Sequence, residues 1–243
     1  SSSASSRVPV LVQSPSVGNE LTYVESLALG SIHTCVIMFN GEVKCLGYNL
    51  YGQLGIPWID FGAQRSSLTY IGTLGVNNVD IALAERDFDG DGILNIFDGN
   101  QILDYRETSL SSAEEHTCAI LDNGSVSCWG RTDRLGINST SAISQSTPVS
   151  IDLGTGRTAV SISASNSHTC AILDNGSVSC WGNGGNGALG NGDDTDRMIP
   201  TLTNSLGVNR TAIAISSGYY HTCVILDNGS VSCWGWGDKG QLG

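Results

Sequence analysis

The stretch His116-Thr-Cys-Ala-Ile-Leu-Asp-Asn-Gly-Ser-Val-Ser-Cys-Trp-Gly130 decides how this chain folds, because it recurs along the sequence. Two further copies, at 168–182 and 221–235, differ from it only by one Ala-to-Val change in the last. A looser copy occupies 33–47, where Leu46 stands in place of the tryptophan. The first cysteines of successive copies are 83, 52 and 53 residues apart. A period near 52 residues indicates a repeat architecture of the propeller kind, and the long first step indicates an insertion of about 31 residues.

Each copy reads as a β-hairpin whose turn fixes the register of its two arms. A three-residue Asp-Asn-Gly loop, with the glycine left-handed in a bulge, is a common hairpin connection. In the copy at 116–130 this loop sets Ile120 opposite Val126, and Cys118 opposite Cys128. Directly opposed Cβ atoms lie about 4.5–5.5 Å apart, near what a disulfide needs. We therefore expect a disulfide across each hairpin, and we expect the cysteine face to pack between neighbouring blades.

All eight cysteines lie in these hairpins, two in each copy and always ten positions apart. The even number and the strict pairing favour disulfides and an oxidising compartment. Zinc binding is the alternative, but zinc sites usually contain close Cys-x-x-Cys pairs, and the chain has none. The predicted disulfides are Cys35–Cys45, Cys118–Cys128, Cys170–Cys180 and Cys223–Cys233.

The rest of the chain reads as short β-strands between turn signals, with no long helical pattern. The sequence therefore predicts an all-β fold, a β-propeller in which four short strands make each blade. The first strand of each unit follows a proline or its equivalent, the second shows β-type alternation, and the hairpin supplies the other two. The predicted first and second strands are Val8–Val12 and Tyr23–Leu29, Leu68–Leu74 and Val79–Leu83, Pro148–Leu153 and Ala159–Ala164, and Pro200–Thr203 and Ala212–Ser216. The four predicted blades are 8–47, 68–130, 148–182 and 200–235, with an insertion at 86–115 inside the second.

Composition limits the partners of the chain. The formal net charge of −12 comes from 23 acidic and 11 basic residues, which argues against nucleic-acid binding or an anionic membrane surface. No apolar run is long enough to span a bilayer, so no membrane insertion is expected. The chain starts Ser-Ser-Ser-Ala-Ser-Ser, without Met or an apolar signal segment, which is typical of a processed or truncated product.

The repeated pattern resembles a known family. His-Thr-x-Ala-Ile-Leu-x-x-Gly-x-Val-x-x-Trp-Gly, followed by Gly-Asn-Gly-Ala-Leu-Gly at 185–190 or Gly-Asp-Lys-Gly-Gln-Leu-Gly at 237–243, is similar to the regulator of chromosome condensation repeat. Tyr51-Gly-Gln-Leu-Gly55 matches the same linker in the first copy. The resemblance implies a β-propeller, which in that family normally has seven blades. With four blades here, either blades are missing from this sequence or other chains complete the ring. The paired cysteines resemble secreted microbial members rather than nuclear ones.

The insertion contains Asp87-Phe-Asp-Gly-Asp-Gly-Ile-Leu-Asn-Ile-Phe-Asp98, which matches a calcium loop. Oxygen-bearing side chains stand at loop positions 1, 3, 5, 9 and 12, with glycine at 6, because Ca²⁺ takes six to eight oxygens around a sharply turned backbone. The run resembles the calcium loops of dockerins and thrombospondin type 3 repeats, although position 12 is Asp rather than Glu. A solvated acidic turn is the alternative. The predicted Ca²⁺ ligands are Asp87, Asp89, Asp91, the carbonyl of Ile93, Asn95 and Asp98.

Other conspicuous residues recur with the repeat, which favours structural roles. The four histidines, His33, His116, His168 and His221, fall one blade apart, so we expect them to hydrogen-bond within the fold rather than to share a metal. Trp129, Trp181 and Trp234 are expected to pack between blades, with a ligand-facing ring as the alternative. Glycosylation acceptors occur at Asn123, Asn138, Asn175, Asn209 and Asn228. Asn138 and Asn209 are the better glycan candidates, because turn chemistry alone would select the other three.

No catalytic constellation stands out, so the sequence predicts a protein that is not an enzyme. We expect an extracellular or cell-surface propeller that acts as a structural or binding scaffold. A propeller that does not close presents edge strands, which template pairing with another copy and could build a filament. One alternative is a secreted protein-binding module or inhibitor that uses one propeller face, as the family's β-lactamase inhibitory proteins do. The other is guanine-nucleotide exchange with chromatin binding, which the paired cysteines and acidic balance disfavour.

Overall fold

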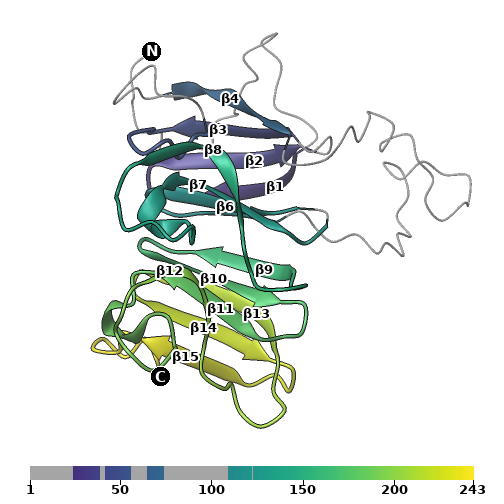
Figure 1. Ribbon diagram of the computed structural model, residues 1–243, viewed down its shortest axis with the longest axis vertical. Helices are drawn as coiled ribbons and strands as arrows, with labels where there is room; N and C mark the ends of the chain where they lie inside the picture. Colours follow the sequence, from purple (N-terminus) through teal and green to yellow (C-terminus); the bar gives the residue numbers. More distant parts are fainter. Residues whose placement is uncertain (1–23, 39–41, 56–64, 74–108, 122) are drawn as a thin grey trace, which may run out of the picture.

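The computed structural model describes residues 24–38, 42–55, 65–73, 109–121 and 123–243. In this part of the chain the strands form four antiparallel β-sheets, which follow one another along the long axis of the molecule (Figure 1). We number these sheets as blades 1 to 4 in chain order. The first three have four strands each, and the described part of the fourth has three.

The strands of each blade are adjacent in sequence and in space. Blade 1 contains β1 (Val24–Leu29), β2 (His33–Met38), β3 (Glu42–Gly47) and β4 (Arg65–Thr73). Blade 2 contains β5 (Ser109–Ser112), β6 (His116–Ile120), β7 (Val126–Arg131) and β8 (Ser144–Ile151). Blade 3 contains β9 (Ala159–Ala164), β10 (His168–Leu173), β11 (Val178–Gly182) and β12 (Arg197–Leu202). Blade 4 contains β13 (Ala212–Ser217), β14 (His221–Leu226) and β15 (Val231–Gly235), and two short 3-10 helices, η2 (Thr132–Arg134) and η3 (Gly185–Gly187), lie in the linkers.

The hairpin register predicted from the turn is confirmed. In blade 2, Cys118 pairs with Cys128 and Ile120 with Val126. Gly124 has a φ of 76°, the left-handed conformation that the three-residue loop requires. The same register places the two cysteines opposite each other in the other three hairpins. All four predicted disulfides are formed, and no cysteine is free.

The grouping of strands into blades differs from the one predicted. The strand after the proline or its equivalent pairs with the hairpin before it: β8 lies beside β7, and β12 beside β11. The blades therefore span 24–73, 109–151, 159–202 and 212–235, which corrects the predicted boundaries 8–47, 68–130, 148–182 and 200–235 by one strand. The physical reason is that the second hairpin arm has a free edge, to which the chain returns after the linkers 132–143 and 183–196. The strand predicted at 8–12 lies outside the described residues.

The inserted segment also has a different place. β5 lies within the range 86–115 assigned to the insertion, and it pairs with β6 in the position predicted for a strand at 79–83. Blade 1 ends at Thr73 and blade 2 begins at Ser109, so the insertion falls between two blades rather than inside one. The sequence held a signal for this: Ser109-Leu-Ser-Ser stands seven residues before His116, as Ser161-Ile-Ser-Ala does before His168.

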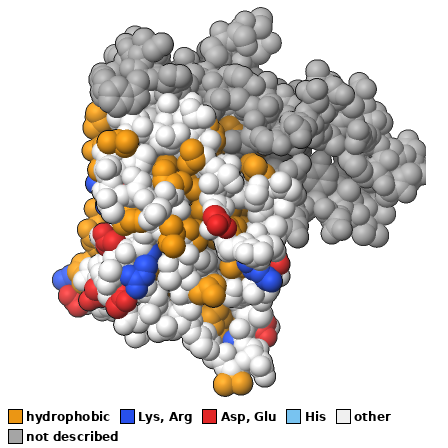
Figure 2. Space-filling view, in the orientation of Figure 1, with side chains coloured by type: hydrophobic (Ala, Val, Ile, Leu, Met, Phe, Trp, Pro, Cys, Tyr) orange, Lys and Arg blue, Asp and Glu red, His pale blue; other side chains and the backbone are white. Residues whose placement is uncertain are grey.

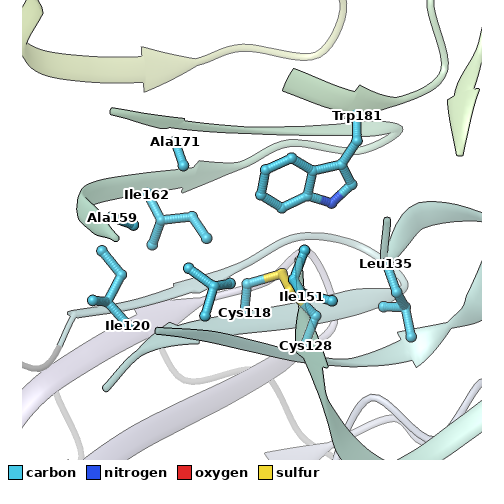
Figure 3. Packing of buried hydrophobic residues seen from close by; sticks show 10 residues of the cluster. Cys118, Ile120, Cys128, Leu135, Ile151, Ala159, Ile162, Ala171 and Trp181 are labelled. Atoms are coloured by element: carbon cyan, nitrogen blue, oxygen red, sulfur yellow. A yellow bond between two sulfur atoms is a disulfide. The ribbon is translucent and has the colours of Figure 1, made fainter. Parts of the chain in front are cut away.

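The core is divided among the contacts between blades. Figure 3 shows Trp181 of blade 3 pointing toward the Cys118–Cys128 disulfide of blade 2. Ile120 and Val126 share this buried face, which confirms the predicted packing of the cysteine side. Equivalent clusters join blade 1 to blade 2 through Trp129, and blade 3 to blade 4, with Trp234 packed against the cluster. Each hairpin therefore has one side for the following blade and one for the preceding blade.

Candidate functional site

A buried hydrogen bond recurs at each contact between blades. The histidine that begins the second strand of one blade reaches the threonine that follows the histidine of the next. The distances from Nε2 to Oγ1 are 2.8 Å for His33 and Thr117, 2.7 Å for His116 and Thr169, and 2.8 Å for His168 and Thr222. The structural hydrogen-bond role predicted for these histidines is confirmed.

The three bonded histidines are uncharged at neutral pH. Desolvation by burial lowers the pKa of His33 to about 4, of His116 to about 3 and of His168 to about 4. For His116, the nearby charge of Arg134 lowers the pKa further. Each imidazole is therefore a neutral hydrogen-bonding group, and these histidine–threonine bonds place no buried charge between the blades.

Blade 4 carries the same hairpin, but no blade among the described residues covers its outer side. In blade 3, Ile172 and Val178 are 0% and 1% exposed, whereas their equivalents in blade 4, Ile225 and Val231, are 42% and 64% exposed. The local sequence is the same apart from one Ala-to-Val change, so the difference comes from the blade that covers the first pair. We call this side of blade 4 the open face; it comprises His221, Cys223, Ile225, Val231 and Cys233.

Two further features belong to the open face. His221 is only partly buried, and within the described residues its side chain has no threonine partner. β15 is the edge of its sheet in the described part of the chain, whereas the equivalent strands β3, β7 and β11 each pair with a fourth strand. The blade therefore offers an apolar surface, an imidazole and a row of backbone groups, which together suit binding of a protein chain.

The other predicted site residues do not converge on the open face. The six predicted Ca²⁺ ligands, from Asp87 to Asp98, lie outside the described residues. Within the described ranges no three or more His, Cys, Asp or Glu side chains are grouped so that they could hold a metal. The five predicted glycosylation asparagines, Asn123, Asn138, Asn175, Asn209 and Asn228, are all exposed.

The asparagines of the hairpin turns have a structural task. Asn175 Oδ1 accepts hydrogen bonds from the backbone N and the Oγ of Ser177, at 3.1 and 2.7 Å. Asn123 and Asn228 accept the same pair from Ser125 and Ser230. Turn chemistry therefore accounts for these three residues, as expected. Asn138 and Asn209 have φ values of 59° and 56° in loops, and glycosylation there stays a prediction.

The repeated segments of the chain match a known repeat. A model of the regulator of chromosome condensation (RCC1) repeat matches residues 24–53, 159–188 and 212–241, and a second RCC1 repeat model matches 175–225. Three segments of the chain thus match the RCC1 repeat. These ranges take in the first three strands of blades 1, 3 and 4, together with the linker that follows each hairpin.

The chain is also similar to two plant proteins. The chain is 33% identical over 153 residues to the ultraviolet-B receptor UVR8 of Arabidopsis thaliana, covering 62% of this chain and 33% of the relative. It is 27% identical over 227 residues to the mitochondrial RCC1 domain-containing protein RUG3 of the same plant, covering 90% and 44%. The chain thus spans less than half the length of either relative.

A solved RCC1 structure has the same fold. Yeast RCC1 (Prp20), bound to Kap60, superposes with a TM-score of 0.67 at 17% identity, covering 90% of this chain and 45% of that one. This likeness confirms the β-propeller fold. In the described part of this chain, no helix combines the length and apolar character that crossing a membrane requires.

Proposed function

We propose that this RCC1-repeat chain is a non-enzymatic binding scaffold of the extracellular space or cell surface, and that it associates with a second copy through the open face of blade 4. The observation that carries the proposal is the exposure of Ile225 and Val231 on a hairpin whose other copies bury the same residues. Covering two such side chains contributes about 1.5–3 kcal/mol each, which favours association.

The scaffold role is supported by how the repeated polar residues are used. His33, His116 and His168 join blades through threonine. Their pKa values are lowered first by burial, and those of His116 and His168 also by nearby positive charge. The cysteines are consumed in disulfides. Four disulfides in one chain support an oxidising compartment, because the cytosol keeps thiols reduced.

The geometry of association has two forms. If blade 1 of the next copy covers the open face, the contact is head-to-tail and repeats into a filament. If blade 4 of the second copy covers it, the pair is symmetric and closed. Val36 and Met38 of blade 1 are already buried and pack with Leu46, which favours the closed pair. Negative-stain electron microscopy separates filaments from pairs.

Sedimentation velocity over a range of concentrations tests the proposal. We expect the wild-type chain to associate and Val231→Glu to remain a monomer, because a carboxylate cannot be covered in the apolar contact without cost. The matched control is Val160→Glu, on β9, where the side chain is 54% exposed and outside the open face. A wild-type chain that stays monomeric, or a Val231→Glu chain that associates like the control, contradicts the proposal.

A second candidate is a secreted module that binds a different protein with one end of the propeller. Yeast RCC1, whose structure has the same fold, was solved bound to another protein, Kap60. Nuclear exchange activity with chromatin binding fits less well, because the chain is strongly acidic. On the side of the molecule that Figure 2 shows, acidic and basic side chains are mixed in small groups rather than gathered into a basic patch.

A further inference from the structure

The loops after the first strands of blades 2, 3 and 4 gather at one end of the propeller. The backbone N of Ala164 donates to Ser111 Oγ, and that of Ser217 donates to Ser163 Oγ, both at 2.8 Å. These contacts join nearly equivalent positions of neighbouring blades, so the strands β5, β9 and β13 run in the same direction. Their ends, and the loops 113–115, 165–167 and 218–220, therefore lie at the same end of the molecule.

A third segment joins each of these loops. The backbone N of the residue after Trp-Gly donates to the carbonyl of the residue before the histidine, at 2.9 Å for Arg131 and Glu115 and at 2.9 Å for Trp236 and Tyr220. The hairpins of blades 2 and 4 are otherwise nearly identical. At this end, however, blade 2 has Glu114, Glu115 and Arg131, whereas blade 4 has Tyr219, Tyr220 and Trp236.

The cluster of blade 2 already holds a cation. Arg131 Nη1 lies 2.7 Å from Glu115 Oε2, and Arg131 Nε lies 2.8 Å from Asp133 Oδ1. The guanidinium carbon also lies 5.4 Å from the centre of the Tyr51 ring, which is cation–π distance. This end of the propeller therefore combines a cation, carboxylates and an aromatic face within one chain.

The cluster of blade 4 has the aromatic faces without the cation. The Tyr219 and Tyr220 ring centres are 4.4 Å apart with an interplanar angle of 79°, and those of Tyr220 and Trp236 are 6.3 Å apart at 82°. Tyr219 is 55% exposed. Among the described residues no Lys or Arg lies over any of these three rings. Their π-faces, which carry partial negative charge, are thus available to a cation from outside.

Carboxylates from blade 2 act on the same cluster. The pKa of the Tyr219 hydroxyl is raised, first by its hydrogen bond with Tyr220 and also by the negative charges of Glu114 and Glu115. Glu114 is partly exposed and has no ion pair within the described part of the chain. The loops 113–115 and 218–220 lie at the same end of the molecule, so Glu114 and Glu115 add negative charge to the end that carries the three rings.

We propose that Tyr219, Tyr220 and Trp236, with Glu114 at the same end of the propeller, form a site for the ammonium group of a lysine side chain of a partner protein. The perpendicular rings offer walls to the ammonium group and its alkyl stem, and Glu114 supplies the opposite charge. An uncharged side chain would contact the rings but would not be attracted by the Glu114 carboxylate. Tyr220 directly precedes His221 of the open face, whereas Ile225 and Val231, which carry the self-association proposal, lie toward the other end of the hairpin. The two proposals therefore concern different residues and are tested separately.

Nuclear magnetic resonance of the full chain tests this site. The probe is an acetylated and amidated Gly-Gly-Lys-Gly-Gly peptide, followed through the indole signal of Trp236; the neutral control carries Nε-acetyl-lysine. We expect a saturable shift with a Kd on the order of 1 mM for the lysine peptide and none for the neutral one. Tyr219→Ala and Glu114→Gln should each weaken binding about five-fold, whereas Tyr219→Phe keeps the ring and the affinity.

Asp194→Asn is the matched control, because it removes one carboxylate from another part of the surface and should leave the Kd unchanged. Tyr219 and Glu114 are surface residues, so their variants should unfold at the wild-type urea concentration, which separates lost binding from lost folding. Equal binding of the neutral peptide would make the cluster a general apolar surface and overturn the proposal. No saturable shift up to about 10 mM lysine peptide would do so as well.

Discussion

The Nε2 atom of His116 in blade 2 lies 2.7 Å from the Oγ1 atom of Thr169 in blade 3, and both residues are fully buried. His221 occupies the equivalent place in blade 4, is partly exposed and has no threonine beside it in the described part of the chain. The chain therefore contains the same residue in the same local sequence, with and without the contact between blades. This pair of histidines isolates what that contact contributes.

We expect His116→Ala to lower the free energy of unfolding by about 3 kcal/mol, because it leaves a cavity and a buried threonine hydroxyl without its partner. His221→Ala should change it by less than about 0.5 kcal/mol. Urea unfolding followed by circular dichroism measures both. Similar losses for the two variants would mean that the histidine acts within its own hairpin rather than between blades.

The free energy of unfolding should also depend on pH, through the three histidines that hydrogen-bond between blades. The folded pKa values of His33, His116 and His168, about 4, 3 and 4, lie below the ordinary value of 6.5. Between the folded and the unfolded pKa values, the unfolded chain therefore binds more protons than the folded chain. The stability that the neutral histidines contribute is complete above pH 6.5 and is lost as the pH falls toward 4. Each histidine contributes up to about 1.4 kcal/mol per pH unit to this loss.

Urea midpoints measured between pH 7.5 and pH 4.5 test the slope. His116→Gln removes one titrating group, so its midpoint should be lower at neutral pH but should fall less steeply with acid than that of the wild type. A variant whose slope equals the wild-type slope would assign the acid sensitivity to other groups.

The hairpin was predictable because its determinants are local. The Asp-Asn-Gly turn and the spacing of Cys118 and Cys128 both constrain the register, and they agree. The blade boundaries were not predictable, because no residue in the segment 148–153 indicates whether it pairs with the hairpin before it or the one after it. That choice depends on which strand edge is free once the hairpin has folded.

The open face could not be predicted for a different reason. The hairpins of blades 3 and 4 differ at one position, so no local signal separates Val178, which is buried, from Val231, which is exposed. Exposure there is set by the neighbouring blade. The aromatic cluster could have been found from the sequence. Tyr219, Tyr220 and Trp236 flank the repeated hairpin, at positions where the other copies have different residues.

The four disulfides should differ in how readily they are reduced. Cys118 and Cys128 are fully buried between blades, whereas Cys223 and Cys233 lie on the open face and are partly exposed. A phosphine reductant should therefore open Cys223–Cys233 first, since thiol–disulfide chemistry requires access to a sulfur atom. Timed alkylation with peptide mass spectrometry identifies the order.

Two controls accompany this measurement. In concentrated urea, where all four hairpins are exposed, the four disulfides should be reduced at similar rates. At protein concentrations where blade 4 associates, Cys223–Cys233 should become protected. Reduction of a buried disulfide first, in the native monomer, would contradict the assignment of the open face.

Calcium binding by the segment from Asp87 to Asp98 stays a prediction, because these residues lie outside the described part of the chain. Isothermal titration of the chelated protein should show one Ca²⁺ bound with a Kd at or below about 1 mM, the range of extracellular calcium modules. Asp91→Ala should abolish the heat, since it removes a side-chain oxygen at loop position 5. Asp194→Asn, an exposed carboxylate in blade 3, is the control and should leave the titration unchanged. No heat at millimolar Ca²⁺ from the wild-type chain would leave the segment as a solvated acidic turn between blades 1 and 2.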